Sequence, residues 1–167
     1  MSVSAVVSDP AAARRQELVL LTAALAWAAA VIHAVVVPQH LDESALVGAF
    51  FVVVAPAQAL WGSWIYRRPE RRVLLAGAVA SLGVVALWAF TRIVGVPVGP
   101  DVWRPESVGA LDVIATVDEV LTAAFAVALA GGNTRLSEAA AWRFGRQLAY
   151  GLLVASLLAP TLGVHSH

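Results

Sequence analysis

Cysteine and lysine are both absent from the 167 residues of this chain. Without cysteine the chain has no disulfide bonds, no thiolate metal ligands and no iron–sulfur clusters. Only 13% of the residues are charged and 60% are hydrophobic, whereas an ordinary soluble domain is about one quarter charged and about half apolar. This balance indicates a protein whose solvent is lipid rather than water.

An excess of charge of either sign is missing as well. Eleven basic residues balance eleven acidic ones, which gives no reason to expect nucleic acid as a partner. The basic residues are all arginine, and with so much alanine and valine this composition indicates a GC-rich bacterial genome. We find no glycine-rich phosphate loop, no dinucleotide fingerprint and no recognisable serine–histidine–acid arrangement, so the sequence leaves open whether the chain is an enzyme.

The sequence does contain long apolar runs. A helix needs about 20 apolar residues to cross the hydrocarbon core of a bilayer, and an isolated strand would leave its backbone groups unpaired there. Five segments meet or nearly meet this length: 17–37, 44–66, 73–94, 108–130 and 145–163. The predicted fold class is therefore all-α, a polytopic integral membrane protein with a single five-helix bundle over residues 14–167. A mobile tail is expected at residues 1–13.

The arginines predict the orientation of this bundle. Nine of the eleven fall before the first segment or on alternate connections: Arg14, Arg15, Arg67, Arg68, Arg71, Arg72, Arg135, Arg143 and Arg146. Only Arg92 and Arg104 fall on the other side. The positive-inside rule then predicts a cytoplasmic N-terminus and an extracytoplasmic C-terminus in the cell (plasma) membrane.

Two alternatives to five spans stay open. The first segment could be a signal peptide, because Arg14 and Arg15 precede an apolar run that contains alanines at 28–30. Its apolar stretch is, however, longer than the usual signal core of about 7–15 residues. The segment 108–130 could be a buried or re-entrant helix because it carries three acids, in which case the C-terminus would be cytoplasmic.

Polar residues gather on the predicted extracytoplasmic half. His33 lies inside the first span, and His40, Asp42 and Glu43 are expected in the loop that follows Pro38. From the other segments this half receives Arg92, Asp101, Arg104, Glu106, Asp112, His165 and His167. All four histidines and five of the eleven acidic residues of the chain are thus predicted on one side.

The acids of segment 108–130 carry the strongest signal for a site. Asp112 and Glu119 are seven residues apart and share a helix face, while Asp118 points about 120° away. A carboxylate within the bilayer normally faces the bundle interior and finds a partner there. The candidate partners are His33, Arg92 and Gln58.

Imidazole and carboxylate together, without thiolate, favour zinc, copper(II), iron or manganese. The predicted metal ligands are His33, His40, Glu43, Asp112 and Glu119. Supporting or gating roles are assigned to Arg92, Gln58, Asp118 and Asp101. None of the spacings matches a named metal motif, and whether the His165/His167 pair binds metal is left open.

The leading functional hypothesis is a small bacterial membrane protein that binds a transition-metal cation at this outward-facing site, for uptake, delivery or a metal-dependent membrane reaction. One alternative is a non-catalytic accessory subunit, in contact with a membrane-protein partner or with further copies of itself. Another is a bis-histidine haem protein that carries electrons, although only His33 lies clearly within a span. A third is a proton-coupled transporter, against which the apolar cytoplasmic halves of the helices count.

Overall fold

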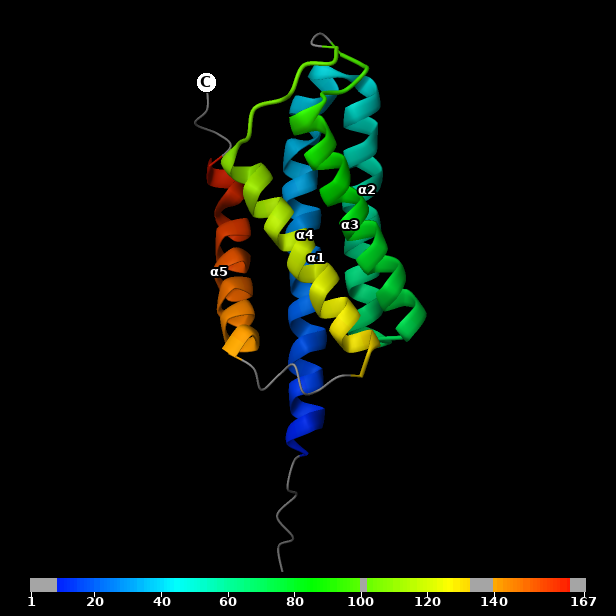
Figure 1. Cartoon of the computed structure of the whole chain (residues 1–167), viewed down its shortest axis with the longest axis vertical. Helices are drawn as coiled ribbons and strands as arrows, with labels where there is room; N and C mark the ends of the chain where they lie inside the picture. Colours follow the sequence, from blue (N-terminus) through cyan, green and yellow to red (C-terminus); the bar gives the residue numbers. More distant parts are fainter. Residues whose placement is uncertain (1–8, 100–101, 133–139, 163–167) are drawn as a thin grey trace, which may run out of the picture.

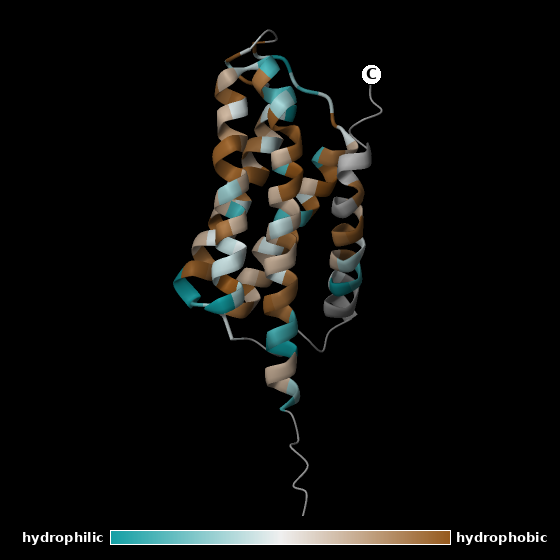
Figure 2. Ribbon diagram, turned by 180° about the vertical axis from the view of Figure 1, so that it is seen from behind, coloured by the Kyte–Doolittle hydropathy of each residue, from teal (hydrophilic) through white to brown (hydrophobic). Residues whose placement is uncertain are grey.

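The computed structural model describes residues 9–99, 102–132 and 140–162, and this part of the chain contains helices and no strand (Figure 1). The helices are α1 (Pro10–Glu43), α2 (Ala45–Arg67), α3 (Arg71–Ile93), α4 (Ala110–Ala130) and α5 (Ala140–Leu162). Within the described residues, α1, α2, α3 and α4 are each long and apolar enough to cross a membrane. Apolar residues dominate the middle of the bundle, and hydrophilic ones gather toward its ends (Figure 2). The predicted all-helical fold of membrane type is confirmed at this level.

The helices run alternately up and down along one long axis (Figure 1). We call the end with the α2–α3 turn, Arg67–Arg72, the arginine end, and the end with the α3–α4 connection, residues 94–109, the loop end. Helix α1 lies centrally and packs against α2, α4 and α5, whereas α3 packs mainly on α4. Because the most apolar stretch of α1 is largely buried in the bundle, α1 is an integral part of the folded core.

Helix α1 extends at both ends beyond its predicted span of 17–37. It begins at Pro10, where the side chain of Asp9 accepts a hydrogen bond from the backbone N–H of Ala11 at 2.9 Å. Proline is well suited to this first turn because its missing N–H would have no partner there. Residues 10–13 are thus helical, in contrast to the predicted tail over 1–13, and residues 1–8 lie outside the described part.

The other end of α1 corrects a second expectation. The helix continues through Pro38 to Glu43, so His40, Asp42 and Glu43 lie in its last turns and not in a loop. The reversal into α2 takes the single extended residue Ser44. It is this tight because α2 approaches α1 at Gly48, where a Cβ atom would overlap Leu41. A proline inside a helix costs one backbone hydrogen bond, and the continued packing of the two helices offsets that loss.

The interface between α2 and α3 differs along its length. Near the arginine end the indole of Trp61 lies directly on Gly77 and donates a hydrogen bond to the carbonyl of Val73 at 2.9 Å. A side chain at position 77 would overlap this ring. The two helices otherwise make few contacts with each other, which leaves space between them toward the loop end.

The 94–109 connection folds back over the loop end. Gly95 has a φ of 87°, a left-handed conformation that glycine adopts without steric cost. Its Cα lies so close to the backbone of Arg104 that a Cβ atom would overlap it. The N–H of Trp103 donates to Val96 O at 2.8 Å, and the N–H of Glu106 donates to Thr91 O at 3.1 Å. The connection is thereby held against the end of α3.

Helix α5 lies beside α1 and α4 (Figure 1). Arg146 forms an ion pair with Glu17 of α1 at 3.2 Å, and Tyr150 donates to the same carboxylate at 3.4 Å. The apolar residues Ala149 and Leu152 join Phe125 of α4 in a buried cluster. These contacts fix one side of the bundle and leave the opposite side, around α2 and α3, without α5.

Candidate functional site

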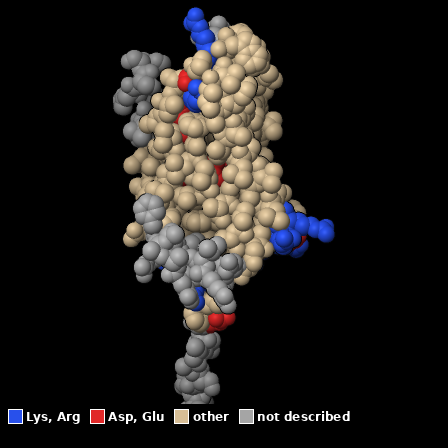
Figure 3. All heavy atoms as spheres, viewed as in Figure 1, with Lys and Arg blue, Asp and Glu red and all other residues tan. Residues whose placement is uncertain are grey.

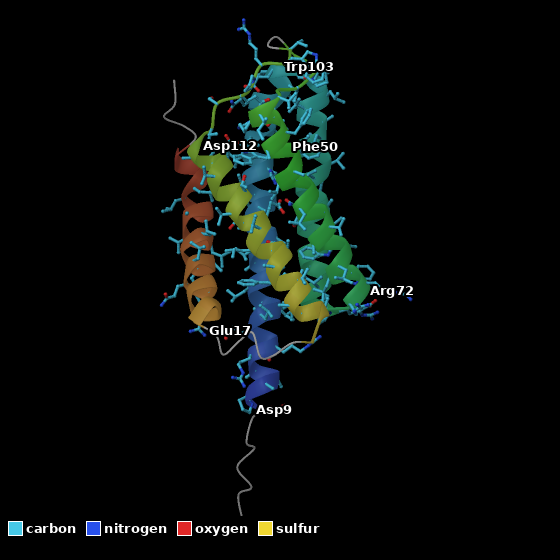
Figure 4. All side chains as sticks on the ribbon, viewed as in Figure 1. Asp9, Glu17, Phe50, Arg72, Trp103 and Asp112 are labelled. Atoms are coloured by element: carbon cyan, nitrogen blue, oxygen red, sulfur yellow. The ribbon has the colours of Figure 1, made fainter. Side chains whose placement is uncertain are left out.

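A cavity of about 380 Å³ lies at the loop end and is lined by residues of α1, α2, α3, α4 and the 94–109 connection. Most of its wall is apolar, with the aromatic residues Phe50, Phe51, Trp88 and Phe90 among the lining. In Figure 4, Phe50 on α2 and Asp112 on α4 both lie in this half of the bundle. The polar lining residues are His33, His40, Thr91, Arg92, Glu106, Asp112, Thr116 and Glu119. These side chains form two clusters that differ in exposure.

The first is the buried cluster, made by His33, Gln58 and Glu119. His33 is 4% exposed and Glu119 is 1% exposed, and His33 Nε2 lies 3.3 Å from Glu119 Oε1. The side-chain amide of Gln58 donates to the same oxygen. With the imidazole proton on Nε2, two donors from two other helices therefore converge on one carboxylate oxygen of α4.

The second is the rim cluster, made by Arg92, Glu106 and Asp112. The guanidinium of Arg92 lies 2.9 Å from Asp112 Oδ2 and also bonds the carboxylate of Glu106. Asp112 also accepts the N–H of Gly109 at 2.8 Å, which caps the first turn of α4. Because Asp112 and Glu106 are about one third exposed, this cluster is partly solvated. Figure 3 shows basic and acidic atoms side by side near the loop end of the molecule.

The two clusters lie on one face of α4. Asp112 and Glu119 are seven residues apart, which corresponds to about 10 Å along a helix axis, and both line the cavity as the sequence predicts. Asp118 is fully buried but does not belong to the lining. The cavity thus runs from a partly solvated rim to a buried carboxylate about two helical turns deeper.

The two described histidines share an aromatic neighbour. The ring of His40 stacks on Phe51 with centroids 4.6 Å apart, and the ring of His33 lies 5.3 Å from the same phenylalanine. His40 Nδ1 lies 3.1 Å from the carboxylate of Glu43 in the last turn of α1. Both histidines are on α1 and contact one ring, and the other two histidines of the chain, His165 and His167, lie outside the described residues.

The predicted metal ligands are distributed over three places. His33 pairs with Glu119, His40 pairs with Glu43, and Asp112 pairs with Arg92. His33, His40, Asp112 and Glu119 all line the cavity, and Glu43 does not. Within the described residues, no three histidine or acidic side chains are grouped closely enough to hold a metal ion. Asp101, His165 and His167 lie outside those residues.

Three lining residues carry a buried polar atom without a hydrogen-bond partner in the described part of the chain: Glu119 Oε2, Trp88 Nε1 and Arg92 Nε. Buried polar groups in proteins are nearly always hydrogen-bonded, and the exceptions are often at sites that bind something. Glu119 is the most buried of the three residues. Its second oxygen is a buried acceptor without a hydrogen-bond partner in the described part of the chain, on a residue that lines the cavity.

Several features of the site were not identified from the sequence. Glu106 was placed near the site but not recognised as the second carboxylate on Arg92, and Phe51 was not singled out at all. The short sequence distance between Glu106 and Arg92, across a turn-rich connection, is a signal that could have suggested their pairing. The predicted partners of the two α4 acids are present, since Arg92 contacts Asp112 and both His33 and Gln58 contact Glu119.

Comparison with known proteins gives no significant match to a family model, to a curated protein or to a solved structure.

Proposed function

We propose that the chain is a bacterial protein of the cell membrane whose five helices all span the bilayer. In this proposal the arginine end and the N-terminus are cytoplasmic, and the loop end and the C-terminus are extracytoplasmic. The exposed arginines of the α2–α3 turn support this orientation through the positive-inside rule. The cavity then opens on the extracytoplasmic half of the protein.

We infer that this cavity binds a cation, and the charges of its lining carry the inference. Three carboxylates, from Glu106, Asp112 and Glu119, line it together with one arginine. Arg92 contacts Glu106 and Asp112, so its charge is already shared between two acids. Among the described residues, the carboxylate of Glu119 bonds the imidazole of His33 and the amide of Gln58.

A charge in a low-dielectric environment is costly unless a counter-charge or a set of hydrogen bonds compensates it. The ionised carboxylate of Glu119 would have one compensated oxygen, Oε1, and one uncompensated oxygen, Oε2. A cation in the cavity removes this deficit directly. It also balances the excess of carboxylate over arginine around the cavity.

A transition-metal ion is one form that this cation could take, and it is the form that the sequence predicts. His33 Nε2 and the carboxylate of Glu119 are ligands of the types that zinc, copper(II), iron and manganese accept. Further ligands would have to come from water or from a substrate. Metal uptake or delivery to an exported protein would both use a site open on the extracytoplasmic side.

Elemental analysis tests this form. The full chain is purified in detergent without a histidine tag, after growth in metal-supplemented medium. About one metal ion per chain, lost in His33→Ala and retained in Asp118→Asn, would support a metal site. Asp118→Asn is the matched control because Asp118 is equally buried on α4 but does not line the cavity. If neither a metal ion nor an organic cation binds the chain, the proposed function is wrong.

A further inference from the structure

The cavity and its lining allow the chemistry of the cation to be narrowed, on the basis of the proposed function. We propose that the ligand is a lipophilic organic ammonium ion: an amine, protonated at neutral pH, that carries an apolar body. Its N–H group donates to Glu119 Oε2, and its apolar body fills the cavity between α2 and α3.

The size and the wall of the cavity favour an organic body over a bare metal ion. A volume of about 380 Å³ falls in the range of small-molecule pockets, about 300–1,000 Å³. A water molecule takes up about 30 Å³ in the liquid, and cavities with apolar walls tend to stay dry. A hydrated metal ion would fill the cavity with water. Most of the wall, including Val84, Val85 and Leu111, would then contact this water instead of an apolar partner.

The ligand set is also poor for a metal ion. In the described part of the chain no three histidine or acidic side chains come together, whereas protein sites for transition metals usually supply three or four ligands. A single ammonium group needs fewer protein ligands than a metal ion. One carboxylate oxygen within hydrogen-bond distance is sufficient for a charge-assisted bond.

The geometry of Glu119 fits one such donor. His33 and Gln58 both point to Oε1, which leaves Oε2 of the same carboxylate without a partner among the described residues. Glu119 lines the cavity and is 1% exposed, and a molecule inside the cavity is the source that we propose for a donor to Oε2. An ammonium N–H supplies both the hydrogen bond and the counter-charge.

Aromatic rings in the lining add to the preference for a cation. Phe50, Phe51 and Phe90 line the cavity, and the face of an aromatic ring attracts an ammonium group by about 0.5–2 kcal/mol. Phe51 lies beside His33, with ring centroids 5.3 Å apart, and is therefore close to the buried cluster. A neutral amphiphile of the same shape would gain the apolar contacts but neither the ring attraction nor the pairing with Glu119.

Calorimetric titration of the full chain in nanodiscs of phosphatidylcholine tests the proposal. The probe is 4-phenylbutylammonium, and 4-phenylbutan-1-ol serves as a neutral analogue of nearly the same shape; nanodiscs without protein give the background of each. We expect the ammonium to bind at least about tenfold more tightly than the alcohol, because truncating a buried charge pair changes affinity by about this much or more. Glu119→Gln should reduce this preference to less than about threefold.

Asp118→Asn is the matched control and should retain the full preference, since Asp118 is buried on the same helix but outside the cavity lining. Thermal unfolding of each variant shows whether it is folded. Phe50→Leu keeps the proposal testable if Glu119→Gln does not fold. This variant should weaken binding of the ammonium several-fold and binding of the alcohol by less.

The outcomes separate this inference from the proposed function. Equal binding of the ammonium and the alcohol would overturn the inference, because the cavity would then not select the ammonium group, and the proposed function would also be wrong if the chain in addition binds no metal ion. Binding of zinc, copper, iron or manganese without binding of the ammonium would overturn the inference and leave the proposed function standing. A preference for the ammonium that survives Glu119→Gln would also overturn the inference, since Glu119 would not be its partner.

Discussion

The same two helices, α2 and α3, meet in different ways at the two ends of the bundle. Near the arginine end they are joined by Trp61, which lies on Gly77 and bonds the backbone of Val73. Near the loop end they are separated by a cavity of about 380 Å³. Close packing at one end thus fixes the two helices as a unit, and their separation at the other end provides the space for a ligand.

The two ends of the bundle also differ in where their charged side chains lie. The arginines of the α2–α3 turn, Arg67, Arg68, Arg71 and Arg72, are all exposed, and Figure 3 shows basic atoms gathered on the surface where Figure 4 labels Arg72. Three carboxylates of the loop half, from Glu106, Asp112 and Glu119, are part of the cavity lining, and Glu119 is almost completely buried. The arginine end has the features expected of a membrane boundary, and the loop half has those of a binding site.

A side chain at position 77, where α3 contacts Trp61 of α2, is expected to cause the largest loss of stability. In Gly77→Ala the new Cβ atom overlaps the indole of Trp61, and overpacking of this kind costs about 1–3 kcal/mol. We expect a loss near the upper end, about 3 kcal/mol in the free energy of unfolding, measured by denaturation in mixed micelles. Gly83→Ala on the same helix is the control, because a Cβ atom there meets no neighbour within 4 Å. Equal losses in both variants would contradict the account.

The rim cluster gives the next effect. Arg92→Met removes the cation from between Glu106 and Asp112, which are about one third exposed. Because both carboxylates keep some contact with solvent, we expect a loss of about 2 kcal/mol in the free energy of unfolding, as for hydrogen bonds to charged groups. Arg72→Met, at an exposed position of the arginine end, should change it by less than about 0.5 kcal/mol. If Arg92→Met and Arg72→Met change the free energy of unfolding by the same amount, the rim cluster does not stabilise the fold.

The buried cluster gives the smallest effect of the three. Gln58→Leu removes one of the two donors to Glu119 Oε1, and we expect a loss of about 1 kcal/mol in the free energy of unfolding. Gln39→Leu is the matched control, since Gln39 also donates to a glutamate, Glu43, but in an exposed position at 3.1 Å. If both glutamines can be replaced without loss, Gln58 does not support Glu119 in the way the structure indicates.

The helices themselves were largely predictable from the sequence. Apolar runs of membrane-spanning length define α2, α3 and α4 to within a few residues, because hydrocarbon requires continuous helices of that length. The turn from α1 to α2 was not predictable in the same way. Pro38 indicated the end of a helix, but α1 continues to Glu43 because Gly48 allows α2 to pack closely on Leu41.

The partners of the buried acids were also within reach of the sequence. Helical spacing places Asp112 and Glu119 on one face, and few polar residues at a suitable depth were available to compensate them. The cavity was not predictable, because it depends on how far α2 and α3 diverge beyond the contact of Trp61 with Gly77. The close approach of Phe51 to His33 and His40 depends on the same tertiary packing.

The central claim is that Glu119 pairs with a cation inside the cavity. Solid-state NMR of the full chain in bilayers tests it most directly, through the dipolar coupling between ¹⁵N-labelled 4-phenylbutylammonium and ¹³C-labelled glutamate side chains. We expect a coupling that corresponds to a distance of less than about 4 Å, as in a charge-assisted hydrogen bond, and that disappears in Glu119→Gln. A coupling that persists in this variant, or the absence of any coupling to glutamate for the bound ligand, would contradict the account.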